Sequence, residues 1–129
     1  MVHGECGCGR VAFEVEGEFD YAFYCHCSRC RRRTGAACSA IGGVALDKVR
    51  IVAGAEHAVR LDESAKGYRC FCGICFGPLY SAVNGRAHIQ LGALTDPPSI
   101  SPNHHIYVGS KAPWHVITDD LPQHDELPL

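Results

Sequence analysis

Cysteine is the residue type with the clearest chemical potential in this 129-residue sequence, which contains nine of them. Eight stand in three tight groups: Cys6 and Cys8; Cys25, Cys27 and Cys30; and Cys70, Cys72 and Cys75. Metal ligands must converge on one point, whereas disulfides usually join distant segments. A secreted disulfide scaffold would favour an even number of cysteines and a signal peptide, and the sequence shows neither. The grouping therefore predicts metal binding.

Two short pairs have the spacing of a closed zinc site. Cys72 and Cys75 form a C-x-x-C motif, and Cys6 and Cys8 are separated by Gly7 alone. Zinc holds thiolates at about 2.3 Å in a tetrahedron, so its sulfur ligands lie less than about 4 Å apart, which such short loops can achieve. We expect these four thiolates to form a structural site that joins the start of the chain to its middle.

The triplet Cys25, Cys27 and Cys30 then remains as a second site. Three ligands from one segment leave the fourth coordination position open, as catalytic zinc sites require. The alternative is a closed site in which Cys70 or Cys38 supplies a fourth thiolate, and spacing alone does not separate the two. Cys38 lies in an apolar stretch and is otherwise expected to be a small buried residue.

Four arginines surround the last cysteine of the triplet: Arg29, Arg31, Arg32 and Arg33. They form either a solvated basic face that offsets the thiolates or a patch that recognises an anionic substrate, since guanidinium groups pair well with carboxylates. His26 lies between two of the cysteines, and we expect it to be a neighbouring or surface group rather than a ligand. His104 and His105 are expected to be ordinary surface or packing residues whose side chains point apart.

Charge and hydropathy exclude several functional classes. The formal net charge is −2, and seven thiolates with two zinc ions would bring it to about −5. Such a protein does not suit nonspecific binding to nucleic acid, which needs a broad basic face. No apolar run of about 18 residues is present, and the first residues do not resemble a secretory signal. We therefore expect a cytoplasmic protein without a membrane or nucleic-acid partner.

The remaining sequence predicts a mainly β fold with little helix. Residues 10–16 and 48–53 alternate between apolar and polar side chains, as half-buried strands do. Segments 78–83 and 86–91 flank Asn84-Gly85, the strongest short signal for a two-residue hairpin turn. One helical turn is expected around residues 28–33.

From about residue 96 the prolines disfavour regular strands. We expect residues 1–129 to form one domain with a proline-rich C-terminal arm that packs through Ile106, Val108 and Trp114 and ends in a frayed acidic tail.

Three motifs resemble one family. GECGCG at residues 4–9, CHCSRCRRRTG at residues 25–35 and FCGICFGPL at residues 71–79 are similar to segments of the glutathione-dependent formaldehyde-activating enzymes, a family that includes the centromere protein V type. The segment HHIYVGSKAPWHVITDDLP at residues 104–122 also resembles the family's tail. One departure is Phe76, which stands where the family usually has a glycine after its last cysteine.

The resemblance implies a fold, two metal sites and a reaction. The fold would be Mss4-like, with short coiled sheets in a zinc-stabilised barrel or tent. Cys6, Cys8, Cys72 and Cys75 would hold a structural zinc, and Cys25, Cys27 and Cys30 a catalytic one. The family reaction adds the thiol of glutathione to formaldehyde, and the four arginines would orient the carboxylates of glutathione.

Two functional hypotheses follow. The first is a zinc-dependent carbon–sulfur lyase that adds a small thiol such as glutathione to formaldehyde or a related aldehyde. The second is a zinc-stabilised β module that binds a partner and catalyses nothing. An open fourth position at the triplet of Cys25, Cys27 and Cys30 would favour the enzyme.

Overall fold

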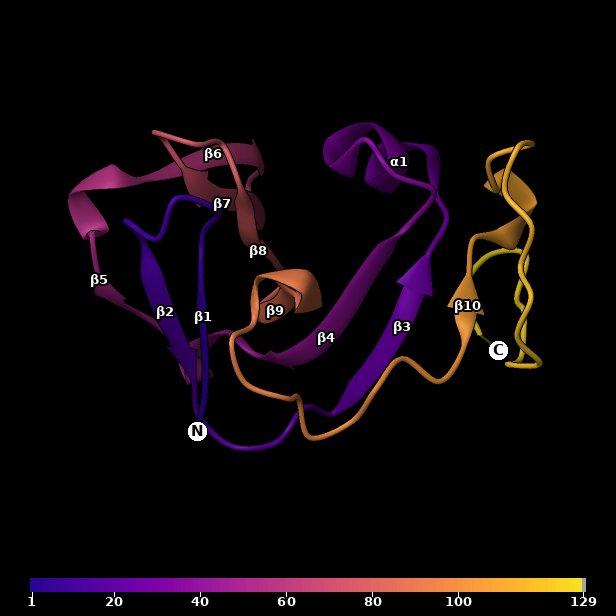
Figure 1. Ribbon diagram of the computed structural model, residues 1–129, viewed down its shortest axis with the longest axis horizontal. Helices are drawn as coiled ribbons and strands as arrows, with labels where there is room; N and C mark the ends of the chain where they lie inside the picture. Colours follow the sequence, from indigo (N-terminus) through magenta and orange to yellow (C-terminus); the bar gives the residue numbers. More distant parts are fainter. Residues whose placement is uncertain (129) are drawn as a thin grey trace.

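The computed structural model describes residues 1–128, which form a smaller and a larger β-sheet (Figure 1). The smaller sheet has the order β1 (Val2–Glu5), β2 (Ala12–Val15) and β5 (Val49–Ala53). The predicted alternation in residues 10–16 is confirmed, because Val11, Phe13 and Val15 are buried. These side chains close one face of the smaller sheet against the rest of the molecule.

The larger sheet has seven strands. In spatial order they are β10 (His105–Ile106), β3 (Tyr21–Cys25), β4 (Ser39–Ala45), β9 (Arg86–Gln90), β8 (Pro78–Val83), β7 (Gly67–Cys72) and β6 (Ala58–Ser64). All neighbours pair antiparallel except β10 and β3, which are parallel. Neither sheet closes on itself within residues 1–128. Of the two predicted forms, a barrel or a tent, the fold is therefore the open, tent-like one.

Helix is scarce, as predicted. The α-helix α1 (Ser28–Thr34) includes the expected turn at residues 28–33, and it ends at Gly35 in the left-handed conformation. The other helical segments of residues 1–128 are four 3-10 turns: η1 (Leu46–Lys48), η2 (Ala55–His57), η3 (Leu91–Ala93) and η4 (Val108–Ser110). The predicted hairpin joins β8 to β9, with φ of 50° at Asn84 and 78° at Gly85. No helix in residues 1–128 is long and apolar enough to span a membrane.

The core is divided into two clusters, and each includes site cysteines. The main cluster contains Phe13, Leu79 and Ile89, together with Cys6 and Cys72. The second cluster consists of Phe23, Cys25, Ile41 and Ile106, between β3, β4 and β10. Packing of the apolar core therefore also positions Cys6, Cys72 and Cys25, because their side chains are part of the core.

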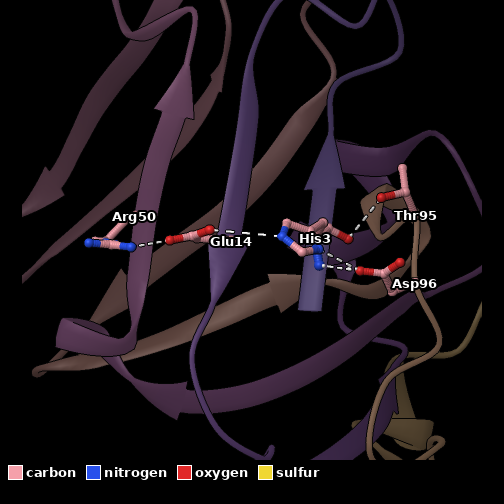
Figure 2. Close-up of polar contacts among 5 residues, drawn as sticks. All are labelled: His3, Glu14, Arg50, Thr95 and Asp96. Atoms are coloured by element: carbon pink, nitrogen blue, oxygen red, sulfur yellow. Dashed lines mark hydrogen bonds and ion pairs between the residues drawn. The ribbon is translucent and has the colours of Figure 1, made fainter. Parts of the chain in front are cut away.

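The C-terminal arm is fastened to the smaller sheet where it begins (Figure 2). The backbone N–H of His3 donates to Asp96, and the ring Nδ1 lies 2.8 Å from the same carboxylate oxygen. These contacts with His3 hold the pKa of Asp96 below its usual range. Thr95 N–H donates to the His3 carbonyl, and the other ring nitrogen lies 3.9 Å from Glu14, which pairs with Arg50. The segment at Thr95 and Asp96 thus starts the arm from a defined point on β1.

The far end of the arm is more ordered than predicted. His105 N–H donates to the Pro122 carbonyl, His124 N–H to the His105 carbonyl, and Tyr107 N–H to the Glu126 carbonyl. The expected frayed tail is therefore wrong for residues 122–126, which return beside β10 at the edge of the molecule (Figure 1).

The arm also packs differently from the expectation. Ile106 is buried as predicted, but Trp114 is 69% exposed. A turn closed by the bond from His115 N–H to the Ala112 carbonyl buries Ala112 and leaves the indole outside. The prediction that the arm packs through Trp114 is wrong, because this turn directs the indole away from the protein.

Candidate metal centres and a cavity

The two cysteine pairs meet in space. Cys6 and Cys8 lie on the loop between β1 and β2. Cys72 is the last residue of β7, and Cys75 lies in the turn between β7 and β8. Their four sulfurs are all within 4.8 Å of one another, with 3.6 Å between Cys6 and Cys8 and 3.8 Å between Cys8 and Cys72. These separations match the edges of a zinc–thiolate tetrahedron, which are less than about 4 Å.

The surrounding backbone favours thiolates at this four-thiol cluster. Val11 N–H donates to Cys6 Sγ at 3.3 Å, and Ile74 N–H donates to Cys72 Sγ at 3.3 Å. A backbone hydrogen bond from Arg10 is the main cause that lowers the pKa of Cys8 to about 6. Because metal ligation requires deprotonated sulfur, this donor set and its hydrogen bonds fit a bound zinc ion.

Phe76 occupies a strained position next to this cluster. Its φ is 62°, the left-handed region that glycine adopts without cost, and its N–H donates to the Cys72 carbonyl at 2.8 Å. The family's usual glycine therefore has a physical reason, since the loop requires a positive φ directly after Cys75. The loop forms in this chain as well, with a phenylalanine in that conformation and its side chain 71% exposed.

Replacing Phe76 with glycine is expected to stabilise the protein by about 0.5–1 kcal/mol. A side chain in the left-handed region costs roughly 1–2 kcal/mol, and the greater entropy of an unfolded glycine removes part of that gain. Urea unfolding of the zinc-loaded protein measures the change. Phe76→Ala is the matched control, because it keeps the Cβ atom and should give no comparable gain. A loss of stability in Phe76→Gly would contradict the strain argument.

The triplet gathers where β3 passes into α1. Cys25 ends β3, Cys27 is the N-cap of α1 and Cys30 lies in its first turn. The three sulfurs lie within 4.8 Å of one another, and Cys30 N–H donates to Cys27 Sγ at 3.3 Å. A hydrogen bond with Cys25 lowers the pKa of Cys30 to about 6, whereas the same contact and burial raise the pKa of Cys25.

Neither candidate for a fourth thiol joins the triplet within residues 1–128. Burial is the main cause that raises the pKa of Cys38, with a contribution from nearby Cys30. Cys70 is buried in the main core beside Tyr80, and burial raises its pKa. The structure therefore brings together three thiols here, in contrast to the four of the other cluster.

Hydrogen bonds connect the triplet loop to the C-terminal arm through two buried histidines and the more exposed Asp119. His26 is fully buried, and its Nε2 lies 2.8 Å from Nδ1 of His105. Nε2 of His105 lies 3.0 Å from both carboxylate oxygens of Asp119. Desolvation raises the pKa of Asp119, but its hydrogen bonds, chiefly the one with His105, outweigh this effect and lower the pKa. Burial lowers the pKa of His26 to about 4, so its ring is neutral at neutral pH.

The carboxylate fixes one direction in this series of hydrogen bonds. An ionised Asp119 can only accept, so Nε2 of His105 donates to it. Nδ1 of His26 is buried and has no hydrogen-bond partner within residues 1–128. These hydrogen bonds hold the Cys25–Cys27 loop in place. His26 lies beside the candidate ligands and is not one of them.

A cavity of about 540 Å³ lies directly beside the triplet, and both Cys25 and Cys30 line it. Side chains alternate along a strand, so Tyr21, Phe23 and Cys25 share the cavity face of β3. The paired positions on β4 are Gly43, Ile41 and Ser39. Residues of β9, β8 and the arm complete the wall, among them His88, Gln90, Ser81, Ile106 and Tyr107.

The four arginines near the triplet have different surroundings. Within residues 1–128, Arg33 lines the cavity and the other three arginines do not. It forms an ion pair with Glu63 of β6. Arg29 and Arg32 are exposed, and Arg31 is partly buried with an unpaired Nε. Positive charge at the C-terminal end of α1 is also favourable for the helix itself.

Comparison with known proteins places the chain in a family. The family model described as glutathione-dependent formaldehyde-activating enzyme matches residues 1–110. The chain belongs to this family. The matched range includes both thiol clusters, and it ends inside the C-terminal arm. The resemblance seen in the three cysteine motifs is thereby confirmed.

Individual relatives agree with the formaldehyde-activating family. A Halomonas elongata protein with the provisional name glutathione-dependent formaldehyde-activating enzyme is 34% identical over 86 residues. The match covers 62% of this chain and 55% of that protein, so the chain spans little more than half of the relative's length. A crystal structure of a Rhodobacter sphaeroides protein superposes with a TM-score of 0.62 at 26% identity, over 75% of this chain and 91% of that one.

Sequence reasoning did not find several residues of the site. His105 and His104 were expected to be ordinary, yet His105 anchors His26 and His104 lines the cavity. The prediction that their side chains point apart is confirmed by these different surroundings. Alternation in residues 21–25 could have placed Tyr21 and Phe23 on the face of Cys25. No local signal connects Asp119 to residue 26, because that contact depends on how the arm returns.

Proposed function

We propose that this chain is a zinc-dependent carbon–sulfur lyase that joins a small thiol to formaldehyde or a related aldehyde. The observation that supports this most directly is the triplet Cys25, Cys27 and Cys30 at the wall of a cavity. A structural metal site needs no adjoining space for a ligand, whereas a catalytic one does. The cavity volume lies within the range of about 300–1,000 Å³ that is typical of small-molecule sites.

The two thiol clusters would divide the metal roles. Cys6, Cys8, Cys72 and Cys75 would hold a structural zinc ion, and Cys25, Cys27 and Cys30 a catalytic one. When bound at three thiolates with one position free, zinc can lower the pKa of a substrate thiol or polarise a carbonyl oxygen. The donor chemistry of both clusters fits this assignment, since thiolate sulfur is a preferred zinc ligand.

The protein itself would supply binding and orientation. In the reaction the thiol sulfur forms a bond to the aldehyde carbon, the carbon–oxygen π bond breaks, and the thiol proton is transferred to oxygen. Phe23 and Ile41 exclude water beside Cys25, which strengthens electrostatic interactions there. Arg33 reaches the cavity three residues after Cys30 and would orient a polar group of the substrate. For Arg29, Arg31 and Arg32 we propose compensation of the thiolate charge.

Catalysis of adduct formation tests the proposal. Zinc-loaded protein, glutathione and formaldehyde are mixed, and exchange between free and hydroxymethylated thiol is followed by NMR. We expect exchange faster than the spontaneous reaction, and loss of the acceleration when Cys27 is replaced with serine. X-ray absorption should find an oxygen or nitrogen ligand at one of the two sites. No acceleration with any thiol and aldehyde pair, together with four sulfurs at both sites, would support the non-catalytic module instead.

A further inference from the structure

The wall of the cavity is largely apolar around its middle. Phe23, Ile41 and Ile106 are 8%, 5% and 4% exposed, and they form the second core cluster that adjoins Cys25. Tyr107 packs against the same cluster from the arm. A ligand that extends from the triplet into the cavity therefore meets hydrocarbon and aromatic surface first.

The cavity offers little free positive charge. Arg33 is the formally cationic residue of the lining within residues 1–128, and its guanidinium is paired with Glu63. The two side chains are 25% and 27% exposed, so the pair is partly shielded from water. Burial lowers the pKa of His88 and of His104, so neither ring adds a cation at neutral pH. The carboxylates of a substrate that carries several of them would lose their hydration here without a free cationic side chain to pair with.

The far end of the cavity carries a neutral polar pair. Tyr21 precedes Cys25 by four strand residues, which separates them by about 13 Å at about 3.3 Å per residue. Its hydroxyl lies 2.8 Å from Nε2 of His88 across β4. Gly43 permits this, because a Cβ atom there would lie 2.1 Å from the Tyr21 ring. This end can exchange hydrogen bonds with an uncharged group.

We infer that the reacting pair carries an uncharged, apolar body, aromatic or branched, that fills the cavity between the triplet and the Tyr21–His88 pair. The inference rests on the proposed function for the location of the reacting sulfur. It narrows the substrate class, because glutathione carries two carboxylates and an ammonium group. Either the thiol or the aldehyde can bring the apolar body, and the two sources are distinguishable by experiment.

Binding of unreactive thioethers separates this inference from catalysis. Benzyl methyl sulfide and S-methylglutathione are titrated into the zinc-loaded protein, and binding is followed by NMR signals of Tyr21 and His88. We expect benzyl methyl sulfide to bind at least tenfold more tightly and to shift both signals. Tighter binding of S-methylglutathione, or no binding of benzyl methyl sulfide, would overturn the inference.

Releasing Arg33 provides a second test. Glu63→Gln removes the carboxylate that pairs with Arg33 but does not alter a cavity residue. S-methylglutathione should then bind several-fold more tightly, which reduces the preference for benzyl methyl sulfide. Glu56→Gln is the matched control, since Glu56 is 73% exposed and distant in sequence from the triplet, and it should leave the preference unchanged. An unchanged preference in Glu63→Gln would contradict the role assigned to the ion pair.

Reaction rates then identify which substrate carries the apolar body. Benzyl mercaptan with formaldehyde tests the thiol, and the small uncharged thiol 2-mercaptoethanol with phenylacetaldehyde tests the aldehyde. The pair that carries the body in its natural position should react faster than glutathione with formaldehyde. Acceleration of glutathione with formaldehyde alone would contradict the inference and retain the proposed function, whereas failure of every pair would contradict the proposed function while the binding preference is still measured.

Discussion

Replacing Cys72 with serine is expected to unfold the domain at 25 °C. Cys72 is fully buried in the main core, and its sulfur lies 3.8 Å from that of Cys8, 64 positions earlier in the chain. Structural zinc contributes about 10–16 kcal/mol of apparent binding free energy in small zinc domains. That is comparable with the whole stability of a domain, about 5–15 kcal/mol. Circular dichroism and zinc analysis of the purified variant measure the loss of fold and metal.

Cys27→Ser is the matched variant at the other cluster, and it should keep the fold. Serine is a favoured N-cap residue, so the hydrogen bond that Cys27 accepts from Cys30 N–H at the start of α1 can be retained. The three thiols of the triplet lie in one short segment, so they also bind metal in the unfolded chain, which reduces their contribution to stability. We expect one zinc ion per chain and a melting temperature close to that of the parent. Equal unfolding of both variants would contradict the division into structural and catalytic sites.

His105→Gln is expected to lower the free energy of unfolding by about 1–3 kcal/mol. The imidazole of His105 is 4% exposed and makes hydrogen bonds with both the fully buried His26 and Asp119. A glutamine side chain cannot reach the positions of both ring nitrogens of His105. Nε2 of the buried His26 therefore loses its partner, at a cost of about 1–3 kcal/mol. Urea unfolding of the zinc-loaded protein gives the value.

The control for His105 is His57→Gln on η2. Its ring pairs at 3.6 Å with Glu56, which is 73% exposed, and exposed ion pairs contribute little. The two variants make the same chemical change, so the difference between them isolates the hydrogen bonds that join His26, His105 and Asp119. A His105 variant as stable as the His57 variant would show that the chain from His26 to Asp119 does not hold the triplet loop.

The features that were predictable from the sequence are local ones. Asn84-Gly85 forms the expected hairpin because two adjacent residues with positive φ define the turn. The buried face of β2 follows from alternation alone. The spacing within each cysteine pair is a local signal. The two pairs were assigned to one site only because a closed zinc site requires four ligands.

Contacts between distant segments were the ones that local reasoning missed. The return of the arm beside β10, which joins His105 to Pro122 and His124, was not predicted. Arg33 could not be separated from Arg29, Arg31 and Arg32 until α1 was placed against the cavity. Glu63, which pairs with Arg33, lies 30 positions away on β6.

The sequence by itself determined the cysteine groups that could hold a metal, the hairpin, the mainly β fold and the family, because each depends on residue types within a few positions or on motifs. Only the tertiary structure decided that the triplet faces a cavity, that one arginine of four reaches it, and that His26 is anchored by His105 and Asp119. The physical reason is that these features arise where β3, β4, β9 and the returning arm meet. The side chains that form them are brought together by packing of the core and by backbone hydrogen bonds of the arm, neither of which leaves a pattern in any single segment.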